Sequence, residues 1–218
     1  MKKLLAITAI LASSLSAHAA PIVHTSDFIN DGTRTQFNSF ENIPNDGTFY
    51  TGGLGPYTED GIRVQQVNGD GGNDIWVTYN PSGWDGAFGW YPNGGDSGYT
   101  MLTLASGLDF LDVGLLIGSG NGGHNTAYYE LWNDGGLVLA GSVAHQVGFH
   151  YLGFAGGGFD TVLLRDGPSG RTVMDGTHNA LTIDAIETQA NQVPEPASLA
   201  LLGLGFAGLA FSRRKAIA

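Results

Sequence analysis

The sequence predicts an all-β domain, a two-sheet antiparallel β-sandwich of the jelly-roll kind, with a signal peptide before it and a short transmembrane helix after it. Of the 35 glycines, 32 fall in residues 20–192, interleaved with apolar and aromatic runs, which is typical of turns between short strands. No stretch of this region shows a long apolar period of 3.6 residues with helix caps. A chain of 218 residues also fits one domain with appendages.

Short β-rich runs supply the expected strands, and several alternate imperfectly between polar and apolar positions. These strands are residues 35–40, 61–67, 74–79, 99–104, 108–118, 127–132, 137–144, 149–154, 159–166 and 180–187. The sequence Asn-Asp-Gly-Gly at 133–136 predicts a hairpin turn. We therefore place the sandwich domain at residues 20–187, with a loosely ordered entry at its beginning, 21–33, and a polar linker at 188–192.

Residues 1–19 have the three parts of a signal peptide. A lysine pair opens the segment, an apolar stretch follows, and the end has the small-x-small pattern that signal peptidase reads. The small residues of that pattern are Ala17 and Ala19. We expect cleavage after Ala19, because cleavage after Ala20 would leave a proline at the first mature position.

The net charge of residues 20–192, the part expected to remain after both ends are removed, limits the kinds of partner that the protein can bind. Between the two ends, four arginines, no lysine and 19 acidic residues give residues 20–192 a net charge of −15. This charge repels phosphates, so nucleic acid and anionic membranes are not expected partners. The chain has no cysteine, which excludes disulfides and every thiolate metal site.

The chain ends in a proline-flanked glutamate, an apolar run and a basic cluster. Residues 199–211 carry no charged or strongly polar side chain, and as a helix they would cover about 20 Å of a hydrocarbon core of about 30 Å. By length alone a buried core helix is the better interpretation. The order of the three parts instead predicts a marginal span, whose basic end at 213–215 stays in the cytoplasm.

This order resembles the PEP-CTERM sorting signal of exported Gram-negative bacterial proteins, which exosortase, a membrane-embedded protease-transpeptidase, processes. The resemblance covers residues 193–218. The matching positions are Val193, Pro194, Glu195 and Pro196 for the recognition motif, 199–211 for the span, and Arg213, Arg214 and Lys215 for the basic end. The resemblance implies tethering to the inner membrane during export, cleavage near the motif, and release or attachment at the cell surface, often in bacteria that make extracellular polysaccharide.

Catalytic motifs are weak or missing. Gly118, Gly120 and Gly123 fit G-x-G-x-x-G, but a β-type segment follows where a dinucleotide site needs a helix. Neither G-x-S-x-G nor H-E-x-x-H occurs. His145 and His150 are five residues apart, which in one strand places them on opposite faces, so we expect no zinc site and no catalytic residues.

Structural calcium is the cofactor that the sequence allows. The oxygen-rich segment 68–74 brings Asp70, Asn73 and Asp74 close together, although such residues also form tight turns. A second site follows from a loose resemblance of residues 35–187 to jelly-roll carbohydrate-binding modules, in which an acidic residue near the first strand and one in the last often share a calcium ion. The matching positions here are Glu41 and Asp184.

Aromatic residues crowd one glycine-rich stretch, and flat rings beside polar groups are suited to stacking on sugars. The ligand candidates are Trp76, Trp84, Trp90 and Tyr91. Core packing is the competing role of such residues. We expect a non-catalytic, exported surface or matrix protein that binds extracellular polysaccharide. The alternatives are a secreted glycan hydrolase, which requires two converging carboxylates, and a purely structural or adhesive matrix subunit.

Overall fold

The computed structural model describes residues 20–42, 56–67, 75–77, 85–86, 88–92, 99–118, 125–145, 149–167 and 181–190. Every helix or strand within these ranges is a β-strand, and all the pairings between strands are antiparallel. The all-β class with two antiparallel sheets is therefore confirmed.

The first sheet carries both ends of the described chain. Its order is β1–β11–β8–β13–β6–β5, and β2 pairs separately with β13. The strands are β1 (Ile22–His24), β2 (Gln36–Asn38), β5 (Ile75–Val77), β6 (Trp90–Pro92), β8 (Phe110–Gly118), β11 (His150–Phe159) and β13 (Thr182–Ala190).

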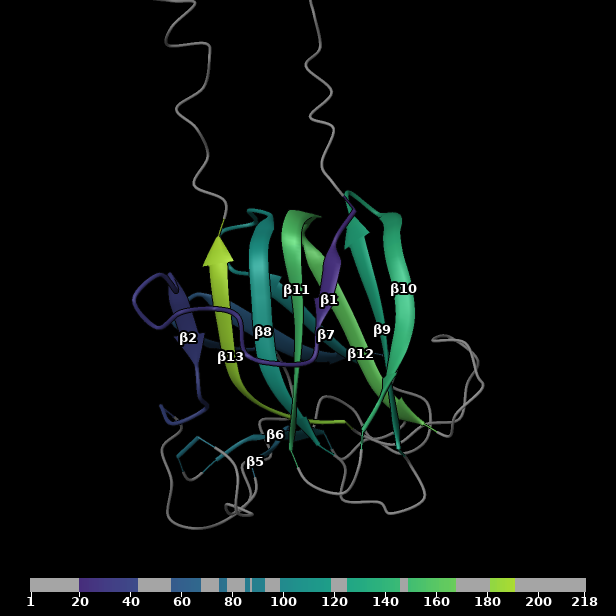
Figure 1. Cartoon of the computed structure of the whole chain (residues 1–218). Helices are drawn as coiled ribbons and strands as arrows, with labels where there is room; N and C mark the ends of the chain where they lie inside the picture. The colour runs from purple at the N-terminus through teal and green to yellow at the C-terminus, as the bar shows by residue number, and fades with distance from the viewer. Residues whose placement is uncertain are drawn as a thin grey trace, which may run out of the picture.

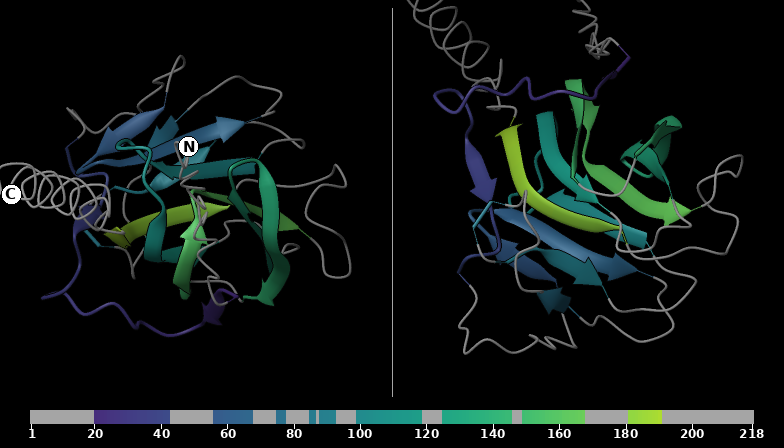
Figure 2. Two further views of the ribbon diagram at one scale, coloured as in Figure 1. Left: turned by 90° about the horizontal axis from the view of Figure 1, so that it is seen from above. Right: turned by 60° about the horizontal axis from the view of Figure 1, so that its bottom comes forward.

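The second sheet has the order β10–β9–β12–β7–β4–β3. Its strands are β3 (Tyr57–Glu59), β4 (Ile62–Val67), β7 (Tyr99–Leu104), β9 (Thr126–Asn133), β10 (Gly136–Ala144) and β12 (Thr161–Gly167). The two sheets lie in separate layers, with β3 and β4 in one layer and β13 in the other (Figures 1 and 2).

An apolar core fills the space between the layers. Alternation along β7 buries Leu102 and Leu104 from one sheet, and β8 contributes Val113, Leu115 and Ile117 from the other. The Phe110 and Phe159 rings stack with their centroids 5.6 Å apart, which joins β8 to the end of β11. Burial of these side chains is the main stabilising contribution to the fold.

Two tight hairpins depend on residues with positive φ. Asp134 and Gly135 have φ of 50° and 76° between β9 and β10, which is the turn that a right-twisted hairpin prefers. The hairpin expected from residues 133–136 is thus confirmed. Asp60 and Gly61 form the same kind of turn between β3 and β4, with φ of 44° and 79°.

The strands expected from the sequence do not include the three short strands β1, β3 and β6. The entry at residues 21–33 was expected to be loosely ordered, but β1 adds Val23 and its neighbours to the edge of β11. The last strand, β13, extends to Ala190, so residues 188–190, which we assigned to the linker, belong to the sheet. The predicted signal peptide at 1–19 and span at 199–211 lie outside the described residues. Among the described residues no helix is long and apolar enough to cross a membrane.

Both ends of the described chain lie at one end of the sandwich. The register places Ile22 of β1 opposite Ala155, Ala155 opposite Asp112, and Asp112 opposite Gln189 of β13. Ile22 and Gln189 are therefore three strand spacings apart, about 14 Å. Figure 1 shows β1 beginning and β13 ending at the same end.

Candidate functional site: an acidic cluster beneath the 85–88 segment

A bulge in β13 positions the most buried carboxylate of the candidate site. The pairing of β13 with β8 shifts register between Asp184 and Glu187, and Ala185 has a φ of 46°. Ile183 and Ile186 both lie in the core, so two residues separate them where regular alternation allows either one or three. Asp184 is completely buried, and its Oδ1 accepts a hydrogen bond of 2.7 Å from the N–H of Ala185.

Glu41 and Asp184 both reach one short segment, residues 85–88. The N–H of Asp85 donates to Asp184 Oδ2 at 2.8 Å, and the N–H of Phe88 donates to Glu41 Oε1 at 2.9 Å. Gly86, between them, has a φ of 80°, and a side chain there would overlap the Glu41 carboxylate. The two acidic residues expected to share calcium are thus joined through the same backbone segment.

Repulsion among these acids is visible in the pKa of Asp184. That pKa is raised from 3.8 to about 8, mainly by burial; the two N–H donors lower it, and the carboxylates of Asp85 and Glu41 add to the rise. Asp184 therefore gains stability either by holding a proton or by lying next to a cation.

The fit to calcium is partial. Calcium takes six to eight oxygen ligands from carboxylates, carbonyls and water. Glu41 and Asp184 supply carboxylate oxygens near one segment, whereas within the described residues no group of three or more histidine and acidic side chains is arranged to hold a metal ion. A calcium ion here would need backbone carbonyls and water for most of its shell. The other predicted calcium residues, Asp70, Asn73 and Asp74, lie outside the described residues.

Trp90 is a core residue. Its side chain has no exposed surface, its ring centroid lies 6.2 Å from that of Phe40, and its Nε1–H donates to Thr100 Oγ1 at 3.0 Å. A ring without an exposed face cannot stack on a sugar, so the prediction of Trp90 as a ligand residue is wrong.

The other aromatic candidates are only partly placed. The backbones of Trp76 and Tyr91 lie opposite each other in the β5–β6 pair. Trp84 lies outside the described residues. It directly precedes Asp85, whose N–H donates a hydrogen bond to Asp184. A ligand role for Trp76, Trp84 and Tyr91 stays a prediction.

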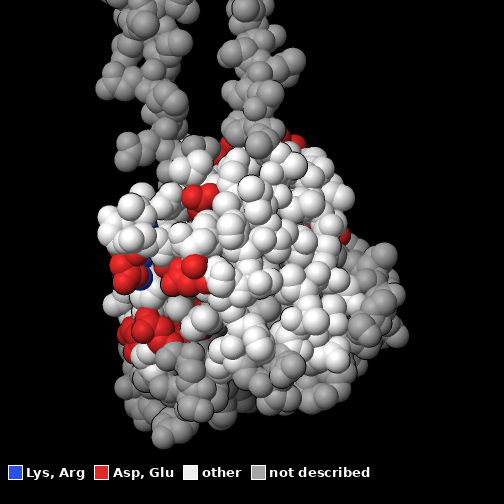
Figure 3. Space-filling view, viewed as in Figure 1, with Lys and Arg blue, Asp and Glu red and all other residues white. Residues whose placement is uncertain are grey.

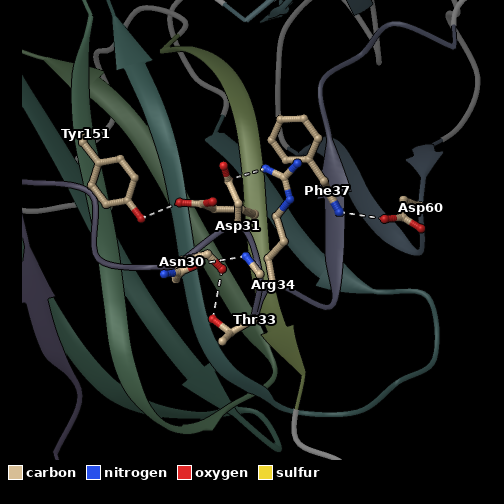
Figure 4. A network of polar contacts seen from close by, with 9 residues as sticks. Asn30, Asp31, Thr33, Arg34, Phe37, Asp60 and Tyr151 are labelled. Carbon is tan, nitrogen blue, oxygen red and sulfur yellow. Dashed lines mark hydrogen bonds and ion pairs between the residues drawn. The ribbon is translucent and has the colours of Figure 1, made fainter.

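A polar network on the outer side of the first sheet was not foreseen. The Tyr151 hydroxyl donates to Glu187 Oε1 at 2.9 Å, and the Arg34 guanidinium contacts Asp31 Oδ1 at 3.1 Å and lies over the Phe37 ring (Figure 4). Burial raises the pKa of Glu187, and the neighbouring Asp27 raises it too, whereas Tyr151 and Arg34 lower it. Carboxyl groups thus converge at a second place, around Glu187. Its residues come from distant parts of the chain, and only the folded structure brings them together.

The histidine pair also differs from expectation. His145 follows the end of β10, His150 begins β11, and their ring centroids lie 6.4 Å apart. His145 Nε2 shares a buried hydrogen bond of 2.9 Å with Asp166 Oδ1. The expectation that these histidines lie on opposite faces is wrong, because it assumed that one strand contains both.

Comparison with known proteins addresses the end of the chain. Residues 192–215 match the family model of the PEP-CTERM protein-sorting motif. The chain carries this sorting motif. The motif implies export, anchoring in the membrane before processing, and processing by an exosortase-type enzyme. The match includes Val193, Pro194, Glu195 and Pro196 and the basic cluster at 213–215, which lie outside the described residues. A search of curated proteins found no match to the chain.

Proposed function

We propose that this chain is a non-catalytic cell-surface or extracellular-matrix protein that associates with extracellular polysaccharide after its sorting signal is processed. The observation that carries the proposal is the PEP-CTERM motif at residues 192–215, which follows directly on a β-sandwich. Two antiparallel sheets are compatible with the jelly-roll connection expected from the sequence, and the removal of residues 1–19 by signal peptidase belongs to the same proposal.

Structural calcium at Glu41 and Asp184 is part of this proposal. A divalent cation would supply positive charge beside carboxylates whose repulsion and burial raise the pKa of Asp184. Because Glu41 and Asp184 hold the backbone of residues 85–88, neutralising them would fix that segment. Trp84 adjoins it and is the aromatic residue that we expect to respond to the ion.

Polysaccharide suits the charge of the body better than other polymers do. A net charge of −15 over residues 20–192 disfavours nucleic acid, and neutral glycans or cation-bridged acidic glycans avoid this repulsion. Figure 3 shows that the acidic side chains on one face gather over the side of β2 and β13, and that most of the face is uncharged.

Processing can be tested by the state of the tail. Replacement of Pro194 and Pro196 by alanine should leave the chain uncleaved and in the membrane fraction, because the motif would no longer be held extended. The wild-type chain should lose its C-terminal segment, as the intact mass would report. The matched control is Pro56→Ala, which leaves both the motif and the signal-peptidase site intact. Equal cleavage of the motif variant and the wild type would reject the assignment of these prolines.

Glycan association can be tested by co-sedimentation of the processed form, residues 20–192, with the insoluble polysaccharide of the producing cell. We expect binding in calcium that falls with chelator and is lost in Trp84→Ala. The matched control is Trp90→Phe, which changes a buried ring and should retain binding. Absence of binding in both conditions would reject the glycan proposal for that polymer and favour the structural matrix subunit.

A secreted glycan hydrolase is the second candidate, and one observation favours it. Glu187 is 6% exposed, and burial together with a hydrogen bond to Asp27 raises its pKa, so Glu187 holds a proton more readily than a free glutamate, as the general acid of a glycosidase must. Release of reducing sugar from the same polysaccharide, lost in both Glu187→Gln and Asp27→Asn, would establish this candidate. No release by the wild-type protein would leave the non-catalytic proposal in place.

A further inference from the structure

The exposed apolar side chains of the described residues gather toward one end of the sandwich. Four large hydrophobic residues have substantial exposed surface: Ile22 at 60%, Leu137 at 53%, Val138 at 40% and Leu111 at 37%. Contiguous exposed apolar patches mark interaction surfaces with proteins or membranes. Both ends of the described chain lie at the same end of the sandwich as these residues (Figure 1).

Strand register places these four residues. Ile22 lies in the row that contains Asp112 and Gln189, and Leu111 precedes Asp112. Leu137 pairs with Trp132, and Trp132 pairs with Thr161. Thr161 lies two residues after Phe159, which pairs with Phe110 at the start of β8. The starts of β1, β8 and β10 therefore lie toward the end where β13 finishes, as Figure 1 shows. We name Ile22, Leu111, Leu137 and Val138 the apolar end.

The tail limits how far this end can lie from a membrane. Eight residues, 191–198, separate the last residue of β13 from the predicted span at 199–211. Fully extended, eight residues reach at most about 29 Å, and any bend shortens this reach. While the span is in the bilayer, the apolar end is consequently within reach of the membrane surface.

We propose that the apolar end is a membrane-docking surface, and that Ile22, Leu111, Leu137 and Val138 contact the inner-membrane bilayer while the tail is anchored. This inference rests on the membrane anchoring of the proposed function and adds the orientation of the folded body. Partial burial of four apolar side chains in the interfacial region is favourable, and the tether removes most of the cost of association.

Acidic groups at the same end define the lipid that suits it. Asp134 is exposed in the β9–β10 turn, where its N–H donates to Asp160 Oδ2 at 2.9 Å, and Asp112 Oδ1 accepts a hydrogen bond from the N–H of Gly156. These carboxylates repel anionic headgroups. Docking should therefore be stronger on zwitterionic phosphatidylcholine vesicles than on vesicles rich in phosphatidylglycerol.

Docking would orient two sites. The sorting motif at 193–196 begins three residues after β13 and stays close to the bilayer, where a membrane-embedded protease acts. The opposite end of the sandwich, which contains His145, His150 and Asp166, would face away from the membrane.

The absence of cysteine allows a direct test with the full chain. Gly136 and Ala144 are the first and last residues of β10, both are exposed, and they lie about 26 Å apart along one strand. Gly136→Cys and Ala144→Cys, each carrying a polarity-sensitive fluorophore, would be reconstituted through the tail into phosphatidylcholine vesicles that contain nitroxide-headgroup lipid. We expect strong quenching at position 136 and weak quenching at position 144. Adding Ile22→Asp and Leu137→Asp, both exposed, should abolish this difference.

The outcomes separate the docking proposal from the anchoring on which it rests. Vesicle flotation of the full chain, with equal quenching at the two positions, would overturn docking and leave anchoring intact. Failure of the full chain to float with vesicles would overturn both. A difference that persists in the aspartate variant would overturn the role of the apolar residues, because proximity from the tether alone would then explain it.

Discussion

Asp184 Oδ2 accepts a hydrogen bond of 2.8 Å from the N–H of Asp85, which lies 99 residues earlier in the chain. Through this bond β13 fixes the position of Asp85, and the nearby N–H of Phe88 donates a hydrogen bond to Glu41. Because the three acidic residues repel one another, the bond ties the geometry of the candidate site to its state of charge.

The first prediction concerns pH. The pKa of Asp184 is about 8 in the folded state, against 3.8 for an unperturbed side chain, so the folded protein binds a proton that the unfolded protein releases between these values. The free energy of unfolding should therefore fall as pH rises through this window. Thermal unfolding without divalent cations should show a lower Tm near pH 8 than near pH 5. Asp184→Asn should flatten the slope, and an unchanged slope in that variant would contradict this origin.

Calcium should act in the opposite direction. An ion that binds beside ionised Asp184 stabilises the folded state only where the carboxylate is charged. Calcium should therefore raise the Tm more above the pKa of Asp184 than below it, with little effect on Asp184→Asn. Magnesium, which demands tighter octahedral geometry, is the matched control. An equal rise in the wild type and the variant would place the ion elsewhere.

Ala185 offers a test of the bulge. Its φ of 46° is costly for a residue with a side chain, by about 1 kcal/mol or more. Ala185→Gly should therefore stabilise the protein in urea denaturation. Ala127→Gly, in the regular strand β9, should instead destabilise it by about 0.5–1 kcal/mol. Destabilisation by both changes would show that Ala185 is not strained.

Trp90 should behave as a core residue. Trp90→Ala should cost about 3–5 kcal/mol of unfolding free energy, because it leaves a large cavity between the sheets. Thr100→Val should cost about 1–3 kcal/mol, since the buried Nε1–H of Trp90 loses its acceptor. In the double variant the costs should be less than additive, because Thr100 then has no indole to bond. Strict additivity would mean that the hydrogen bond contributes nothing.

Gly114 should resist substitution. A Cβ there would overlap the Tyr151 hydroxyl, which donates to Glu187. Gly114→Ala should therefore destabilise the fold by about 1–3 kcal/mol. Much of that loss should disappear in a Tyr151→Ala background, where the ring is gone. A loss of the same size in both backgrounds would point to the backbone of β8 as the cause.

Local signals made part of this structure predictable, and long-range pairing made the rest unpredictable. The turn at Asp134 and Gly135 is encoded in neighbouring residues, so the β9–β10 hairpin was found. The three residues of β1 form a strand only because β11 offers them an edge about 130 residues later in the sequence. Nothing near Ala185 in the sequence marks a left-handed alanine.

Some residues of the candidate site could likewise be predicted from the sequence, and others could not. The pairing of Glu41 with Asp184 was expected from family resemblance, and the structure brings both to residues 85–88. Whether Trp90 faces solvent or core depends on its contacts with Thr100 of the second sheet and with Phe40, which follows β2, and its position in a glycine-rich stretch predicted the wrong side. The Tyr151–Glu187 contact joins two strands that are distant in sequence and therefore had no local signal.

The nearness of Ile22 and Gln189 has a consequence for folding itself. A precursor whose leader and tail are both held in one membrane is a closed loop, even when its body is unfolded. Closing that loop removes conformational entropy from the unfolded chain, whereas the folded body already holds its ends close together. The precursor should thus be more stable than the released protein, and the first cleavage, at either anchor, should return that lost freedom to the unfolded state.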